Sequence, residues 1–181
     1  MEHPLKKFRY CPICGSEKFV EHNDCSKFCR QCGFHYYLNA VSAVAAFVVN
    51  KKNELLLCYR AQEPKKGTLD LPGGFVDINE TAEEAVKREV LEELNLETDT
   101  VSYLFSIPNK YLYSDFTVHT LDMFFKIEVK NLSNIKCRDD VADAKFVHFD
   151  KINIDEIGLE SIKIAVKMFI DYSLDILKLK F

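Results

Sequence analysis

Residues 74 to 96 read GFVDINETAEEAVKREVLEELNL, and this stretch says most about the fold and the chemistry of the chain. Thr81 is followed three residues later by Glu84, which is a capping-box pattern, so we expect a helix over residues 82–94. The expected buried stripe of this helix consists of apolar residues three and four positions apart: Ala82, Val86, Val90 and Leu94.

Three glutamates lie on a second face of the predicted helix. Glu89, Glu92 and Glu93 are spaced i, i+3 and i+4, which places them within a sector of about 100°. Such like charges repel one another by a few tenths of a kcal/mol per pair on an exposed helix. An acidic run alone is most often a solvated face. Here a glycine and further charged residues stand at fixed distances from it, and convergent carboxylates are the ligands of a hard cation such as Mg²⁺.

Length and composition suggest one domain of ordinary size with a small additional module. The chain has 181 residues, of which 48% are apolar, and its net charge of -4 argues against a dominant nucleic-acid or membrane-surface footprint. The N-terminus, MEHPLKKFRYC, lacks the apolar core of a secretory signal, and no apolar run has the length of a membrane span. We therefore expect a cytoplasmic protein without a membrane partner.

Cysteines crowd the first part of the chain. Five of the seven lie between residues 11 and 32, and two CxxC pairs, Cys11 with Cys14 and Cys29 with Cys32, are separated by fourteen residues. This spacing predicts a structural four-thiolate Zn²⁺ site, with Gly15 and Gly33 after each pair where the backbone often needs a positive φ. The alternatives are a mixed ligand set that includes His22, Cys25 or His35, and a redox dithiol pair.

The remaining chain reads as strands around two helices. Apolar residues 41–49 and 55–59 predict a hairpin, residues 69–71 a short extended piece, and Pro72-Gly73-Gly74 a turn that can approach a ligand. Further predicted strands are 101–107, 121–129 and 145–149, and residues 157–179 have helical periodicity. These elements predict an α/β fold, with a mixed sheet between helices. The predicted domains are a zinc ribbon over residues 1–38 and a second domain over residues 39–181.

The pattern of residues 74–96 resembles the Nudix box of the Nudix hydrolase superfamily at every charged position, and departs from it at Asn95, where the family usually has glycine. Asparagine tolerates a left-handed backbone, so a helix C-cap should survive the change. The resemblance implies a Nudix α/β/α sandwich over about residues 40–181. It also implies hydrolysis of a nucleoside diphosphate linked to another group.

Carried over to this chain, the resemblance implies that Glu89, Glu92 and Glu93, with the Gly73 carbonyl, bind Mg²⁺ or Mn²⁺. It implies that Arg88 and Glu80 form a buried support for these ligands, for which a planar guanidinium is better suited than an ammonium group. Glu89 is one candidate general base. The alternatives lie in a later loop, where a solvated acidic loop explains the residues equally well: Asp139, Asp140 and Asp143.

A four-cysteine ribbon directly before a Nudix domain further resembles the NADH pyrophosphatases, including the pair Tyr36-Tyr37. That group carries an SQPWPFPxS signature after the box, of which this chain keeps only Ser106, Pro108 and Ser114. NADH and ADP-ribose are thus both candidate substrates. Aromatic residues in this region, Phe105, Tyr111 and Tyr113 together with Phe116, would either stack on the substrate or pack a strand pair.

The sequence therefore predicts a metal-dependent pyrophosphohydrolase that acts on a small-molecule nucleotide, such as a dinucleotide or nucleotide sugar. One alternative is hydrolysis of nucleoside triphosphates with release of pyrophosphate. Another is a non-catalytic nucleotide sensor whose ribbon contacts nucleic acid, a reading that the modest basic cluster at residues 6–9 does not favour. Removal of nucleotide caps from RNA is a related enzymatic variant. The apolar C-terminal helix would suit a homodimer.

Overall fold

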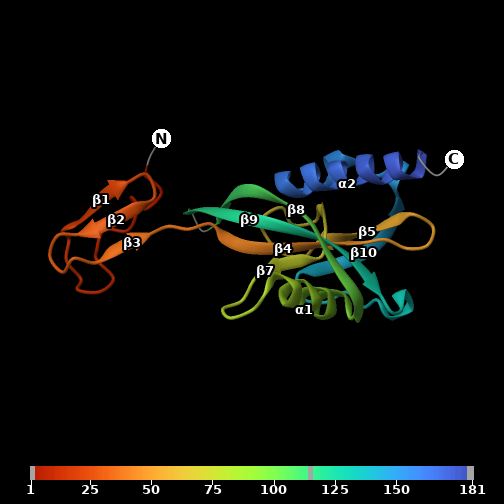
Figure 1. Cartoon of the computed structure of the whole chain (residues 1–181), viewed down its shortest axis with the longest axis horizontal. Helices are drawn as coiled ribbons and strands as arrows, with labels where there is room; N and C mark the ends of the chain where they lie inside the picture. Colours follow the sequence, from red (N-terminus) through yellow and green to blue (C-terminus); the bar gives the residue numbers. More distant parts are fainter. Residues whose placement is uncertain (1–2, 114–115, 179–181) are drawn as a thin grey trace.

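The computed structural model describes residues 3–113 and 116–178. A small N-terminal sheet is followed by a larger body in which strands lie between two helices (Figure 1). The strand-rich body with a helix on either side is the α/β/α sandwich that the sequence predicts, and its four-stranded sheet is mixed as expected. Among the described helices, none combines the length and the apolar character that a membrane span requires.

The N-terminal sheet consists of three antiparallel strands in the order β1-β2-β3: β1 Phe19–Asn23, β2 Ser26–Cys29 and β3 His35–Tyr37. Two tight turns carry the CxxC pairs. In these turns Gly15 N donates to Cys11 O at 2.9 Å and Gly33 N donates to Cys29 O at 2.9 Å. Both glycines have a positive φ, 71° and 79°, as the sequence predicts, and this conformation closes each turn around its cysteines.

The larger body contains two sheets. A four-stranded sheet has the order β7-β4-β9-β8, with bounds β4 Val41–Val48, β7 Gly73–Phe75, β8 Thr98–Tyr113 and β9 Phe116–Val129. Strand β4 runs parallel to β9 and antiparallel to β7. A three-stranded sheet has the order β10-β5-β6, with bounds β5 Glu54–Arg60, β6 Leu69–Asp70 and β10 Val141–His148.

The predicted hairpin of residues 41–49 and 55–59 is wrong, because the two segments pair only next to the turn that joins them. Val49 and Leu55 form one antiparallel bridge, after which β4 and β5 separate into different sheets. Strand β4 is buried over Val44–Val48 between two neighbouring strands, and β5 pairs with β10. The predicted turn at Pro72-Gly73-Gly74 is likewise part of a strand, β7. Continuous apolar runs fit a doubly covered strand as well as a hairpin, so the pairing partner could not be read from them.

The two long helices cover opposite faces of the four-stranded sheet (Figure 1). Helix α1, Ala82–Leu94, packs on a core that includes Val44, Ala46 and Phe125, and α2, Glu160–Lys178, packs on a core that includes Phe47 and Phe124. Alternate residues of β4 and β9 thus serve different cores. Three short 3₁₀ helices complete the body: η1 Leu132–Asn134, η2 Phe149–Lys151 and η3 Ile154–Glu156.

Helix α1 begins and ends where its local sequence predicts. The Thr81 side chain accepts from Glu84 N at 3.2 Å while Glu84 Oε2 accepts from Thr81 N at 2.9 Å, which completes the capping box. At the other end Asn95 adopts the left-handed conformation, with φ 57° and ψ 36°. The asparagine therefore serves the C-cap that glycine usually provides.

An aromatic contact joins the ribbon and the body within the described residues. Phe8 stacks on Phe116 of β9, with ring centroids 5.7 Å apart and an angle of 3° between the planes. Residues 38–40 connect β3 to β4 without regular structure. The predicted domain boundary between residues 38 and 39 falls in this connection and stays a prediction.

Candidate active site

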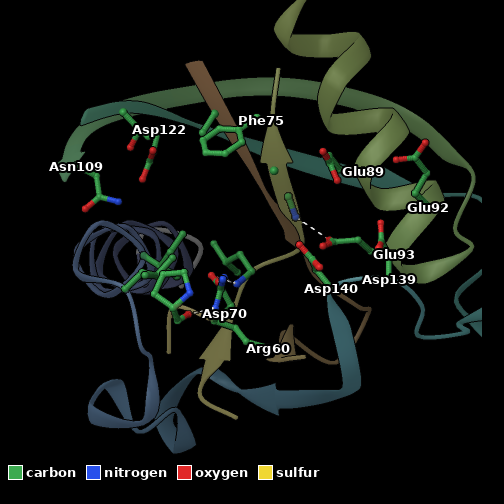
Figure 2. Close-up of a pocket in the computed structure, with 18 of the residues that line it drawn as sticks. Arg60, Asp70, Phe75, Glu89, Glu92, Glu93, Asn109, Asp122, Asp139 and Asp140 are labelled. Carbon is green, nitrogen blue, oxygen red and sulfur yellow. Dashed lines mark hydrogen bonds and ion pairs between the residues drawn. The ribbon is translucent and has the colours of Figure 1, made fainter. Parts of the chain in front are cut away.

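The glutamates of α1 border a pocket of about 360 Å³ at the end of the sheet. Figure 2 shows Glu89, Glu92 and Glu93 on one side of this pocket, beside Asp139 and Asp140. Burial increases from one glutamate to the next: the side chain of Glu92 is 50% exposed and that of Glu89 is 13% exposed, while Glu93 is 4% exposed. The helical spacing in the sequence thus brings three carboxylates to one wall.

Strand β7 lies directly against these carboxylates. Gly73 N donates to Glu93 Oε2 at 2.9 Å, which ties the deepest glutamate to the strand. Gly73 has a φ of 152°, and a Cβ there would overlap the carbonyl oxygen of Val44. A Cβ on Gly74 would come within 2.8 Å of Glu89 Cδ. Both glycines are therefore required for the close approach of β7 to β4 and α1.

Arg88 joins the acidic side chains into one network. Its Nε and Nη2 donate to the two oxygens of Glu80, both at 2.9 Å, and Nη2 also donates to the Phe75 carbonyl at 3.0 Å. Its Nη1 donates to Glu89 at 2.9 Å and to Glu92 at 3.1 Å. The Arg88 side chain is 26% exposed and that of Glu80 is 15% exposed, so the expected support of the glutamates is present in the geometry and half-buried. These hydrogen bonds, with that to Glu80 the strongest, raise the pKa of Arg88 further above its ordinary value.

Burial makes the two inner glutamates hard to ionise. It raises the pKa of Glu93 to about 8, against the hydrogen bond from Gly73 N and with the help of the neighbouring charges of Glu89, Asp70 and Asp140. Burial also raises the pKa of Glu89, although the Arg88 guanidinium opposes this shift. A divalent cation would relieve both groups, so the donor set fits the Mg²⁺ or Mn²⁺ that the sequence predicts.

The pKa of Glu93 predicts how metal-free protein responds to pH. Since the folded-state pKa lies above the unfolded value of 4.5, Glu93 stabilises the fold fully below about pH 4.5 and progressively less as pH rises to about 8. The Glu93→Gln variant cannot ionise there. In buffer without Mg²⁺ or Mn²⁺ we expect it to gain roughly 2 kcal/mol over native protein between pH 5 and pH 8. Urea unfolding at both pH values measures this difference, and parallel changes in the two proteins would contradict it.

The far side of the pocket contains polar and aromatic residues that sequence reasoning missed. Its walls include Phe75 of β7, Asn109 of β8, and Thr120 and Asp122 of β9 (Figure 2). A buried ion pair between Arg60 and Asp70 lies below them. Asp122 occupies a polar position in the alternation of residues 121–129, so its burial could not be predicted from that pattern. The other residues likewise could be found only from strand register.

The predicted substrate-stacking residues lie elsewhere or outside the described side chains. Phe105 packs in the α2-side core, with its ring centroid 5.3 Å from that of Phe124, and it is not among the residues that line the pocket. This placement supports the packing alternative for Phe105. The side chains of Tyr111 and Tyr113 lie outside the described part of the structure. Their roles in substrate binding stay predictions.

The candidate bases after the last long strand divide into two groups. Asp139 and Asp140 line the pocket beside Glu93, as Figure 2 shows, and Asp139 has a positive φ of 52°. Asp143 lies on β10, is exposed, and accepts from Ala144 N at 2.8 Å. Within the described residues it does not line this pocket, so its geometry does not favour a role as base.

The four predicted cysteines come together in the N-terminal module. Their Sγ atoms all lie within 4.8 Å of one another, and the pairs Cys11–Cys32 and Cys14–Cys29 are each separated by 3.6 Å. A tetrahedron of sulfurs about 2.3 Å from Zn²⁺ needs nearly this spacing. In the described part of the chain His22, Cys25 and His35 do not join the cluster, and His22 instead packs edge-on against His35. The cluster thus fits a zinc ribbon.

Comparison with known proteins gives consistent results. Residues 40–166 match the family profile of the NUDIX domain. The chain is 34% identical over 151 residues to an ADP-ribose pyrophosphatase of Methanocaldococcus jannaschii, an alignment that covers 82% of this chain and 81% of that protein. It is 32% identical over 108 residues to the NAD-capped RNA hydrolase NudC of Vibrio vulnificus, but covers only 40% of that relative's length.

The fold has solved relatives as well. A crystal structure of a NUDIX hydrolase from Nitrosomonas europaea superposes with a TM-score of 0.67 at 23% identity, and the match covers 90% of each chain. At this identity the likeness concerns the fold alone.

Proposed function

Since this chain belongs to the Nudix hydrolase family and is a Nudix pyrophosphohydrolase, we propose that it cleaves the diphosphate bond of ADP-ribose or a closely related nucleoside diphosphate derivative. The carrying observation is the pocket itself. One wall gathers Glu89, Glu92 and Glu93, and the opposite side offers Phe75 and Asp122, groups suited to a nucleoside. ADP-ribose is favoured because the named ADP-ribose pyrophosphatase aligns over four fifths of both chains.

We place Mg²⁺ or Mn²⁺ at the acidic wall. Carboxylate oxygens of Glu89, Glu92 and Glu93 and the carbonyl of Gly73 would hold it, as hard cations prefer oxygen ligands. Bound there, the ion would neutralise the diphosphate and lower the pKa of a bound water. The raised pKa values of Glu89 and Glu93 support this assignment, because carboxylates that are expensive to ionise alone become stable beside a dication.

The protein groups would divide the remaining work. Glu89 is our proposed general base, because burial raises its pKa toward the range in which a carboxylate can take a proton from water. Arg88 would hold Glu89 and Glu92 in position through its guanidinium. Asp139 and Asp140 line the same pocket and are the competing candidates for the base.

Hydrolysis of an NAD cap on RNA is the second candidate function. The NudC match points to it, although this chain spans only two fifths of that relative, and most of the SQPWPFPxS signature is absent. A groove of about 440 Å³ in the N-terminal module supports it, because basic and aromatic side chains alternate there, including Phe8, Arg9 and Tyr10. Such a surface can stack single-stranded bases and contact phosphates.

We further propose that Cys11, Cys14, Cys29 and Cys32 hold one structural Zn²⁺. A shell of four sulfurs leaves no open position for a substrate, so the ion would stabilise the ribbon rather than take part in hydrolysis. The ribbon would then hold in place the groove that Phe8, Arg9 and Tyr10 line, and would keep Phe8 stacked on Phe116.

A substrate panel tests the proposed function. Purified protein with Mg²⁺ or Mn²⁺ is incubated with ADP-ribose, NAD, NADH, NAD-capped RNA and nucleoside triphosphates, and the products are separated by anion-exchange chromatography. We expect AMP and ribose 5-phosphate from ADP-ribose, at a kcat/KM at least tenfold above the other small molecules. Preference for capped RNA would support the second candidate. Preference for a triphosphate, with release of pyrophosphate, would overturn both.

A further inference from the structure

The floor of the pocket is a row of side chains on one face of the four-stranded sheet. Asn109 of β8 is paired in register with Thr120 of β9, and Asp122, two residues further along β9, faces the same side. The row continues through Ala43 of β4, paired with Asp122, to Phe75 of β7, paired with Ala43. This row of side chains therefore runs from β7, beside the glutamates of α1, to Asp122 on β9.

Asp122 is a buried carboxylate without a cation. It is 7% exposed, and its Oδ2 accepts from Ser161 Oγ of α2 at 2.6 Å. Among residues 3–113 and 116–178, no basic group forms an ion pair with it, and its Oδ1 accepts no hydrogen bond but is not fully enclosed. Leu159 and Ile162, which flank Ser161, line the same pocket. Oδ1 is therefore available to accept a hydrogen bond from a ligand in the pocket.

Thr120 provides an independent sign that something is missing from this end of the pocket. It is 3% exposed, lines the pocket, and its Oγ1 is buried without a hydrogen-bond partner in the described part of the chain. Unsatisfied buried polar groups are rare in native structures and often mark a ligand site. Thr120 Oγ1 and Asp122 Oδ1, two residues apart on β9, are therefore both without a hydrogen-bond partner among the described residues at this end of the pocket.

The position of Asp122 selects the part of the substrate that it meets. In the order β7-β4-β9-β8, strand β9 lies two interstrand spacings, about 10 Å, from β7 and the glutamates beside it. Asp122 contacts α2 through Ser161, whereas Glu93 lies on α1, which covers the opposite face of the sheet. A substrate whose diphosphate lies at Glu93 would therefore meet Asp122 with another of its groups, the attached nucleoside.

Resting on the proposed function, we propose that Asp122 is a specificity-determining residue that accepts a hydrogen bond from the nucleoside of the substrate. The donor is neutral, either the ribose 2′-hydroxyl or the exocyclic amine of the base, because an anionic group would meet the Asp122 charge. Asn109 and Thr120 complete this nucleoside subsite, and Ser161 is a positioning residue that holds the carboxylate toward the pocket.

Kinetics with modified substrates test this subsite. The native protein and Asp122→Ala are compared on three compounds: ADP-ribose, inosine diphosphate ribose, which lacks the base amine, and 2′-deoxyadenosine diphosphate ribose, which lacks one ribose hydroxyl. We expect Asp122→Ala to lower kcat/KM on ADP-ribose by 30-fold or more. On the compound that lacks the donor, native protein and variant should agree within threefold, and this compound identifies the donor.

Controls separate recognition from folding. Asp99→Asn removes an exposed acid from β8, outside the pocket, and should leave all three rates unchanged. Asp122→Leu, which is close in volume but has no acceptor, replaces Asp122→Ala in the comparison should the latter not fold. An equal loss on all three compounds, or a loss below threefold on ADP-ribose, would overturn the proposal.

Calorimetric titration with ADP-ribose distinguishes this proposal from the proposed function. If the native protein binds ADP-ribose without hydrolysing it, and Asp122→Ala binds it at least tenfold more weakly, the subsite is supported and the proposed function is wrong. If Asp122→Ala hydrolyses ADP-ribose as fast as the native protein does, the proposed function is supported and the subsite is wrong. Neither binding nor hydrolysis would overturn both.

Discussion

Replacing Glu92 with glutamine should lower kcat by about three orders of magnitude and leave the fold intact. Glu92 is the outermost of the three glutamates, with half of its side chain exposed, so its removal leaves no buried charge without a partner. It loses one hydrogen bond from Arg88 Nη1, an i,i+4 contact worth about 0.5 kcal/mol. Loss of an ionised metal ligand, by contrast, raises the barrier by about 4 kcal/mol, which corresponds to that thousandfold decrease.

The matched control for this variant is Glu83→Gln. Glu83 lies on the same helix, is exposed, and does not line the pocket, so the substitution removes the same charge without touching the site. We expect native turnover in the control, and melting temperatures within about 2 °C of native for both variants. The measurement is kcat on ADP-ribose at saturating Mn²⁺. Activity of Glu92→Gln above a tenth of native would refute the assignment of Glu92 as a metal ligand.

The parts of the fold that sequence predicted are those that local chemistry controls. Both ends of α1 follow from nearby residues: the capping box at Thr81 and Glu84, and the left-handed Asn95. The positive φ of Gly15 and Gly33 is equally local. Where the outcome depended on distant pairing, prediction failed, and β4 and β5 separated into two sheets.

The candidate active site also contains residues that local spacing predicts and residues that depend on distant strand pairing. Three metal-site candidates lie on one helix, so a period of 3.6 residues was enough to bring Glu89, Glu92 and Glu93 together. The opposite side of the pocket requires β8, β9, β4 and β7 to align, and no local spacing contains that register. Aromatic residues show the consequence: Phe105 was predicted in the site and packs in the core, while Phe75 lines the pocket.

This arrangement separates chemistry from specificity in the molecule. The acidic wall, strand β7 and Arg88 all lie within residues 73–93 and are held together by short-range hydrogen bonds. The proposed nucleoside subsite, by contrast, takes residues from separate strands and from α2, so substitutions there would leave the hydrogen bonds of the acidic wall in place.

Arg88→Lys should lower kcat about a hundredfold, although it keeps the positive charge. Arginine has five N–H groups, and all five are used here: two for Glu80, one for the Phe75 carbonyl, one for Glu89 and one for Glu92. An ammonium group donates at most three hydrogen bonds from a single point, so at least two of these contacts are lost. At about 1.5 kcal/mol for each hydrogen bond to a charged group, two lost contacts correspond to the hundredfold effect.

Measuring kcat over a range of Mn²⁺ concentrations distinguishes two contributions of Arg88, its positive charge and the orientation it gives to the glutamates. If it positions the glutamates, more Mn²⁺ cannot restore their orientation, and kcat of Arg88→Lys should stay low at saturating metal. Lys87→Gln, which removes the neighbouring exposed cation from α1, should behave like native protein and thereby excludes a general effect of helix charge. Recovery of more than half of the native kcat in Arg88→Lys, at any Mn²⁺ concentration, would show that the charge alone matters. The planar arrangement of five donors predicts otherwise, because only a fork of that shape can hold Glu80, Glu89 and Glu92 at once.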